Sequence, residues 1–305
     1  MVSLTPKQQE IRDWLAKRHA ILLAHNYQPP EIQDIADFLG DSLALSMAAA
    51  KTPARVIVFA GVHFMAETAA ILCPDKTVLL PRIDAGCYMA NTITAEALRA
   101  RKAQLPGVPV VAYVNSSAAV KAESDICCTS ANAVRVVNSL AEPRVLMVPD
   151  RNLALYTAAH TDKEVLYWDG CCNIHDALTV EEVRNARAAH PQAIFLAHPE
   201  CRPEVLALAD AVRSTSGMLA YVRQSSAREF IIGTEMGIIY TLQKENPEKS
   251  FYSPSPGLLC PDMKRITLDD ILVSLEKNRH VITLPEDIRL RALRAVERML
   301  AVPRD

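Results

Sequence analysis

The chain lacks an excess of charge of either sign. Its 33 Lys and Arg residues stand against 35 Asp and Glu residues, which leaves a formal net charge of −2. Proteins that bind nucleic acids or membrane surfaces usually carry a basic excess. The composition therefore argues against both kinds of partner, and we expect no nucleic acid and no membrane among the ligands.

Long hydrophobic runs are also missing. Apolar stretches such as Val56–Ala60 are far shorter than the ~20 residues that a membrane-spanning helix needs. The N-terminal segment is polar and charged, unlike a secretory signal, and the chain has no Gly/Ser linker. Because hydrophobic residues still make up 50% of the 305 residues, the chain can build a large core. We therefore expect a soluble, cytoplasmic protein.

Cysteine is present in number but without the usual short spacings. The chain has neither the paired C-x2-C motifs of a zinc ribbon nor the C-x2-C-x2-C run of a ferredoxin. In a reducing compartment, disulfides are not expected. The eight cysteines are Cys73, Cys87, Cys127, Cys128, Cys171, Cys172, Cys201 and Cys260.

Short apolar runs alternate with amphipathic stretches, which is typical of βαβ units and a mostly parallel sheet. The pattern repeats three times along the chain. Three of the apolar runs end at polar residues 85 to 88 positions apart, namely His25, Tyr113 and His198. Seventeen residues after each of them stands a hydroxyl, in the order Ser42, Ser130 and Thr215. Another apolar run ends 36 residues after each, at Gly61, Pro149 and Thr234.

The end of each unit carries a cysteine in the same register. These residues are Cys87, Cys172 and Cys260, and a threonine follows each by seven positions, at Thr94, Thr179 and Thr267. A hydroxyl before acidic residues is a typical helix start. We therefore predict three homologous α/β/α units with small parallel sheets around a pseudo-threefold axis. The predicted units span residues 1–104, 105–190 and 191–266, and a C-terminal helical closure spans 267–305.

The repeat predicts a binding site at the centre of the three units, because ligands of open parallel sheets bind beyond the carboxyl ends of the strands. Three thiolates from three units fit a [4Fe–4S] cluster whose fourth iron is open and acts as a Lewis acid. Buried structural cysteines are the alternative interpretation, since free cysteine is often buried. The shared register favours the ligand interpretation. It also selects Cys172 over Cys171, because only Cys172 lies seven residues before its threonine.

The polar residues at the strand ends are the remaining candidates. Taken singly, Ser42, Ser130 and Thr215 are best explained as helix N-caps. Together, three helix N-termini facing one cavity form a site for a polyanionic ligand. A lone histidine at a strand end is more often structural, but six polar side chains at matched positions favour a site. The six are His25, Tyr27, Tyr113, Asn115, His198 and Glu200, and His175 either starts a helix or reaches the rim of the cluster.

The sequence resembles the quinolinate synthases. The matching segments run from residue 24 to residue 264 in the family order and include AHNYQ, GDSLALS, AGCYMANT, AHPEC, STSG and CPDMK. The resemblance implies three domains around a [4Fe–4S] cluster held by Cys87, Cys172 and Cys260. It also implies condensation of iminosuccinate with dihydroxyacetone phosphate to quinolinate, phosphate and water, with L-aspartate oxidase as a possible supplier of iminosuccinate.

The resemblance also assigns roles to residues. Substrate-binding positions fall on His25, Ser42, Tyr113, Val114, Asn115, Ser130, His175, His198, Pro199, Glu200 and Thr215. As a hypothesis, Tyr27 and Glu200 relay protons, with His198 and Tyr113 assisting. The sequence departs from the family pattern at Asn26, where an aromatic is common, and at Arg213, where glycine is common. Met263 stands where a further cysteine would be needed for a regulatory disulfide, so we expect none there.

Two other classes of protein fit part of the pattern. Diphthamide-synthesis radical enzymes and hydroxymethylbutenyl diphosphate reductase also place one cysteine per unit on a cluster, but their motifs differ from those seen here. A non-enzymatic iron–sulfur sensor or anion-binding protein would bind cluster or ligand without turnover. The ring of polar strand ends is more than such a protein needs.

Overall fold

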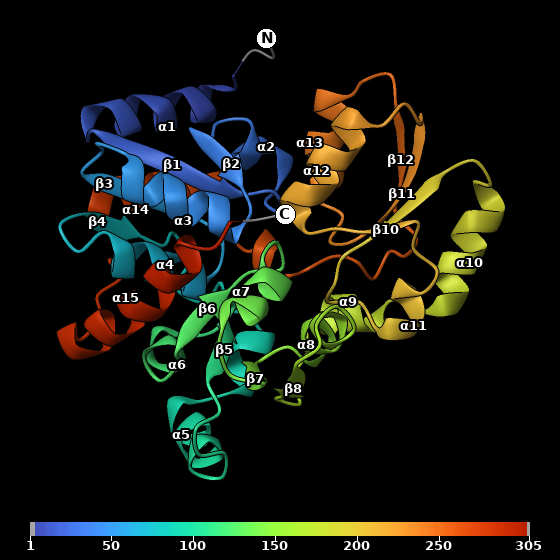
Figure 1. Cartoon of the computed structure of the whole chain (residues 1–305). Helices are drawn as coiled ribbons and strands as arrows, with labels where there is room; N and C mark the ends of the chain where they lie inside the picture. Colours follow the sequence, from blue (N-terminus) through green and yellow to red (C-terminus); the bar gives the residue numbers. More distant parts are fainter. Residues whose placement is uncertain (1–3, 304–305) are drawn as a thin grey trace.

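A computed structural model describes residues 4–303 and shows three lobes around a common centre (Figure 1). Each lobe contains one four-stranded sheet, and the strand orders are β2-β1-β3-β4, β6-β5-β7-β8 and β10-β9-β11-β12. All strand pairs within the sheets are parallel. Because the same order occurs three times, the predicted α/β fold of three repeated units is confirmed. Residues 1–3 and 304–305, which belong to the first and last predicted segments, lie outside the described residues.

The elements of the first lobe follow one another closely. Its strands are β1 (Ala20–His25), β2 (Phe38–Gly40), β3 (Val56–Ala60) and β4 (Thr77–Leu79). The helices up to the start of the second sheet are α1 (Pro6–Lys17), α2 (Pro30–Gln33), α3 (Ser42–Lys51), α4 (His63–Leu72), the 3₁₀ turn η1 (Met89–Thr92) and α5 (Ala95–Ala103).

The second lobe repeats this plan. Its strands are β5 (Val110–Tyr113), β6 (Ile126–Cys128), β7 (Arg144–Val148) and β8 (Glu164–Tyr167). Its helices are α6 (Ala118–Ala122), α7 (Ala133–Ser139), α8 (Arg151–Ala158), α9 (Asn173–Ala177) and α10 (Val180–Ala189).

The third lobe and the C-terminal helices complete the chain. The strands are β9 (Ile194–Ala197), β10 (Ala211–Val212), β11 (Glu229–Gly233) and β12 (Ser250–Tyr252). The helices are α11 (Pro203–Leu206), α12 (Thr215–Gln224), α13 (Ile238–Glu245), the 3₁₀ turn η2 (Asp262–Lys264), α14 (Leu268–Lys277) and α15 (Glu286–Leu300). Helix α14 packs against α1, whereas α15 packs against α6, β6 and α4. The two helices of the predicted closure thus lie on different units, and the unit boundaries stay a prediction.

An aspartate fixes the first strand of every sheet in the same way. The carboxylates of Asp37, Asp125 and Asp210 accept the N–H groups of Leu22, Val110 and Phe195, each at 2.8 Å. Each pair is 15 residues apart. The sequence analysis missed this landmark, although its spacing follows the repeat.

In every unit, a lysine from outside the helix binds the carbonyls at the C-terminal end of one helix. Lys76, Lys163 and Lys249 each donate to two main-chain carbonyls at or just beyond the C-terminal ends of α3, α7 and α12. These carbonyls have no partner within their helix, so a cation there is favourable. The repeat therefore extends to side chains that hold the elements together.

The helix starts partly follow the prediction. Thr94, Thr179 and Thr267 are the N-caps of α5, α10 and α14, as predicted. The expectation that Ser42, Ser130 and Thr215 cap their helices is wrong. Asp41 and Ser214 cap α3 and α12, because their side chains accept the N–H groups of Ala44 and Gly217. In α7 the N-cap position belongs to Asn132. The three hydroxyls are therefore not needed as caps.

No helix within residues 4–303 is long and apolar enough to cross a membrane.

Candidate active site at the centre of the three units

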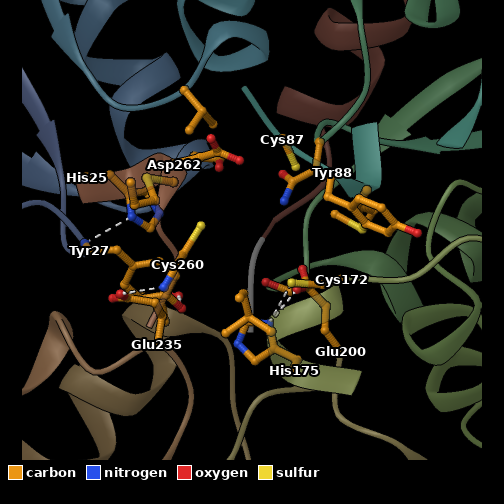
Figure 2. A pocket seen from close by; sticks show the side chains of 18 of the residues that line it. His25, Tyr27, Cys87, Tyr88, Cys172, His175, Glu200, Glu235, Cys260 and Asp262 are labelled. Atoms are coloured by element: carbon orange, nitrogen blue, oxygen red, sulfur yellow. Dashed lines mark hydrogen bonds and ion pairs between the residues drawn. The ribbon is translucent and has the colours of Figure 1, made fainter. Parts of the chain in front are cut away.

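A pocket lies where the carboxyl ends of the strands from all three units meet. Figure 2 shows its side chains entering from several sides. Thirteen of the candidate residues line it: His25, Tyr27, Ser42, Cys87, Tyr113, Asn115, Ser130, Cys172, His175, His198, Glu200, Thr215 and Cys260.

Two candidates lie elsewhere. Val114 is buried in the core of the second unit. Pro199 lines a separate cavity between the second and third units, together with Arg213 and Ser130. Neither side chain reaches the central pocket, so any contact of these two residues with a ligand there would involve the main chain.

The three cysteine loops are attached to the fold by one repeated main-chain hydrogen bond. The N–H groups of His63, Arg151 and Met236 donate to the carbonyls of Ala85, Gly170 and Leu258, at 2.8, 2.7 and 2.8 Å. Each donor lies three residues after the end of a strand, and each acceptor lies two residues before a cysteine of the pocket. Cys172, and not Cys171, therefore occupies the position equivalent to Cys87 and Cys260.

The sulfur atoms of Cys87, Cys172 and Cys260 point from three sides toward the middle of the pocket (Figure 2). All eight cysteines carry free thiols. Burial raises the pKa of the Cys87 thiol to about 12 and that of Cys172 well above its usual range. Three thiolates gathered around one pocket need a compensating positive charge. Three free thiols from three units fit a cluster held by three cysteines.

A second group of metal-binding atoms lies in the same pocket. Cys172, His175 and Glu200 offer ligand atoms that lie within 4.8 Å of one another. These atoms already contact each other, since His175 Nδ1 lies 2.8 Å from Glu200 Oε2 and 3.2 Å from Cys172 Sγ. The carboxylate and the thiol thus both face the Nδ1 position of one histidine ring.

A continuous chain of hydrogen bonds crosses the pocket. The Tyr113 hydroxyl donates to Glu200 Oε1 at 2.6 Å, and Glu200 Oε2 contacts His175 Nδ1 at 2.8 Å. The other ring nitrogen, Nε2, lies 2.8 Å from the Thr234 hydroxyl. Thr234 in turn lies 2.6 Å from the Tyr27 hydroxyl, which also contacts the Thr215 hydroxyl at 2.8 Å. Groups from all three units therefore share one path for protons.

Two histidines of the pocket are neutral at physiological pH. Burial lowers the pKa of His25 to about 4 and that of His198 to about 3. His25 Nδ1 accepts the Tyr27 N–H at 3.1 Å, and His198 Nδ1 accepts the Glu200 N–H at 3.4 Å. The proton of each neutral ring is therefore on Nε2, which makes Nε2 a hydrogen-bond donor.

Glu200 is held as a carboxylate. Burial by itself raises the pKa of this group, but His175, His198 and the Tyr113 hydroxyl outweigh burial and lower it. By contrast, burial raises the pKa of both Tyr27 and Tyr113 well above the usual value. The pocket thus combines an ionised acceptor with two protonated phenols, a suitable set for proton transfer.

One side chain of the pocket has an unmet hydrogen bond. Asn115 Oδ1 is buried and has no hydrogen-bond partner among the described residues. Buried polar atoms are nearly always paired in folded proteins. This oxygen therefore marks a place where a ligand with a donor group would fit.

Sequence reasoning missed several residues at the site. They are Thr234, which the repeat marks as the end of a strand, and the two acidic residues that follow strands, Asp150 and Glu235. Asp41 and Glu235 line the pocket. The signal was available, because residues 62, 150 and 235 stand 37 positions after the three polar strand ends.

Comparisons with known proteins identify the family of the chain. The family model described as quinolinate synthetase A protein matches residues 9–301. The chain is 59% identical to the quinolinate synthase of Geotalea uraniireducens and also to that of Geobacter metallireducens. Each alignment spans 298 residues, which are 98% of this chain and 98% of the relative. It is 56% identical to the quinolinate synthase of Methanosarcina barkeri over 294 residues, which are 96% of this chain and 97% of the other. The chain belongs to the quinolinate synthetase A (NadA) family.

Proposed function

We propose that the protein is a quinolinate synthase that condenses iminosuccinate with dihydroxyacetone phosphate and releases quinolinate, phosphate and water. The observation that carries this proposal is the central pocket, in which three thiols and a chain of proton-carrying groups from all three units meet. Both family membership and the matched motifs support it.

Cys87, Cys172 and Cys260 would hold a [4Fe–4S] cluster, one per chain. When bound, the cluster supplies an open iron that acts as a Lewis acid toward a hydroxyl or carboxylate of the reacting molecule. The support from this chain is the common attachment of the three cysteine loops and the gathering of their sulfur atoms around one space.

The carboxylates of the substrate need donors, and the pocket provides them. The Nε2–H groups of His25 and His198 and the hydroxyls of Ser42, Ser130 and Thr215 line it. Ser42 and Thr215 are the first residues of α3 and α12, where the helix ends carry partial positive charge. Asn115 Oδ1 would accept a hydrogen bond from the imine nitrogen or from a hydroxyl group. Val114 and Pro199 would contribute main-chain atoms only.

Proton transfer is assigned to the hydrogen-bond chain. Glu200 is the ionised acceptor, and Tyr27 is the phenol at the other end, with His175 and Thr234 between them. A proton taken by Glu200 can pass through the His175 ring to Thr234 and Tyr27 without leaving the protein. Tyr113 holds the Glu200 carboxylate by donating its hydroxyl to Oε1, and His198 Nδ1 accepts the main-chain N–H of Glu200.

The proposal implies partners and a compartment. Iminosuccinate is an unstable imine, so an enzyme that oxidises aspartate, such as L-aspartate oxidase, is the expected supplier. Eight free thiols suit a reducing compartment, so we infer that the reaction takes place in the cytoplasm.

Anaerobic purification followed by iron and sulfide analysis and a quinolinate assay tests the proposal. We expect roughly four irons per chain and formation of product. Absence of iron from an anaerobic preparation would refute the cluster. Cluster binding without turnover would favour a sensor, and cleavage of S-adenosylmethionine or a requirement for an electron donor would favour the other cluster enzymes.

The choice of cysteine is tested separately. Cys172→Ala should abolish the cluster, and Cys171→Ala should leave it intact, because only Cys172 shares the repeated attachment to the fold. Loss of the cluster in Cys171→Ala alone would contradict this assignment.

A further inference from the structure

Two buried carboxylates occupy the same position in the second and third units. Asp150 and Glu235 each lie two residues after the end of a strand, β7 and β11. Their exposed fractions are 2% and 1%. Neither residue belongs to the hydrogen-bond chain that crosses the pocket, so the proposed reaction leaves them without a role.

Asp150 connects a helix to a cysteine. Its Oδ1 accepts the N–H of Leu153 at 2.7 Å and so caps α8. Its Oδ2 accepts the N–H of Cys172 at 2.9 Å. One acidic side chain thus connects the main chain of Cys172 to the N-terminal end of α8.

Glu235 makes the equivalent connection in the third unit. Its Oε2 accepts the N–H of Gly237 at 2.7 Å, just before α13. Its Oε1 accepts the N–H of Cys260 at 3.1 Å and pairs with Lys264 Nζ at 2.9 Å. Figure 2 shows Glu235 beside Cys260.

The first unit does without such a carboxylate. Val62 stands at the corresponding position and has no carboxylate, and the main-chain bond from His63 to Ala85 joins the loop of Cys87 to the start of α4. The fold of a unit therefore does not require an acid here. What Asp150 and Glu235 add is a second attachment, and in both cases it is made to the cysteine itself.

We propose that Asp150 and Glu235 are positioning residues that fix the main chain of Cys172 and Cys260 and thereby aim their sulfur atoms at the cluster. The inference rests on the proposed cluster site. The two acids hold the cysteine N–H groups in place before and after the cluster binds. Outer groups that orient metal ligands typically change metal affinity by about 10- to 100-fold.

Isosteric amides separate this role from helix capping. In Asp150→Asn the amide has one acceptor for two N–H donors. Asparagine is a good N-cap, so it keeps Leu153 and turns its NH2 group toward the Cys172 N–H. Glu235→Gln loses one acceptor in the same way. Asp125→Asn is the matched control, because Asp125 also accepts a main-chain N–H, that of Val110, but from the first strand of its sheet.

Two measurements decide the question. Hydrogen exchange should speed up in residues 169–175 of Asp150→Asn and in residues 257–263 of Glu235→Gln, each in its own loop only. In the anaerobically loaded proteins, a chelator should remove iron about 10- to 100-fold faster from both variants than from the wild type. Asp125→Asn should change neither quantity.

The results also separate this inference from the proposed function. Iron loss within twofold of that of Asp125→Asn would overturn the positioning role, even if exchange increased. A wild-type protein that takes up no cluster would refute the proposed function. Without a cluster, hydrogen exchange in the two cysteine loops remains the test of the positioning role. Unchanged exchange in both loops would overturn the inference as well.

Discussion

Thr234 links the two ends of the hydrogen-bond chain that crosses the pocket. It joins the His175 ring to the Tyr27 hydroxyl. We predict that Thr234→Val, which keeps the shape but removes the hydroxyl, lowers kcat by about 100-fold and leaves KM nearly unchanged. Thr241→Val is a matched control, since Thr241 is also buried but bonds Gln33 away from the pocket. Equal rates in the two variants would contradict the relay.

His25 makes stability depend on pH. Its pKa is about 4 in the folded protein and near 6.5 when unfolded, because burial disfavours the charged ring. The unfolded chain therefore binds the proton first. Stability from this residue is complete above pH 6.5 and falls by on the order of 3 kcal/mol as the pH drops to 4.

Urea unfolding from pH 7 to pH 4 tests the effect of His25. Asp41, Glu200 and Lys264 also act on this ring and stay in place in His25→Asn, whose amide oxygen can still accept the Tyr27 N–H. The variant should lose stability less steeply on acidification. An unchanged slope would rule out His25 as the source.

Single residues were predictable where the repeat showed a pattern in all three units. His25, Tyr113 and His198 form such a set, and so do the three cysteines of the pocket. Thr234 and Glu235 were missed because their counterparts in the first unit are Gly61 and Val62, which suggest no chemistry. The common spacing marks these positions, but the contacts of their side chains follow only from the three-dimensional structure.

Among the elements, α12 begins at the pocket with Thr215. Its other end is fixed by Lys249, whose Nζ donates to the carbonyls of Val222 and Ser225 at 2.5 and 2.9 Å. Lys249→Met leaves these carbonyls unpaired, and we predict a loss of about 2 kcal/mol in the free energy of unfolding. The measurement is urea unfolding.

Lys277 supplies the control for this change. It lies in the last turn of α14 but is exposed to solvent. Lys277→Met should alter stability by less than about 0.5 kcal/mol. Similar losses in both variants would show that the carbonyl contacts of Lys249 do not matter.

At the level of elements, the sequence was a good guide to strands and a partial guide to helix starts. Strands could be located because their apolar runs are short and regularly spaced. Ser42 and Thr215 each stand at the start of a helical pattern, where a hydroxyl is expected to cap the helix. The caps are Asp41 and Ser214, one residue earlier, and both Asp and Ser cap well. A propensity cannot distinguish between two adjacent residues of suitable type.

The molecule as a whole is three units that meet at one pocket. A cluster bound by one cysteine from each unit would therefore connect all of them, and anything that binds only the folded chain stabilises it. We predict that anaerobic loading raises the midpoint of thermal unfolding by about 5–10 °C. Cys171→Ala should keep this increase and Cys172→Ala should lose it. An increase that survives in Cys172→Ala would contradict the predicted ligand set.

The bonds from Asp37, Asp125 and Asp210 to the strands lead to one further consequence. These bonds give the three units the same backbone arrangement around the first strand. The side chains that reach the pocket nevertheless differ between units, since His25, Tyr113 and His198 stand at one equivalent position. Equal scaffolds that carry unequal groups can surround a molecule that has no symmetry of its own. The three units can also be compared with one another. The effect of a side-chain substitution at one position can be measured against the same substitution at the equivalent position of another unit.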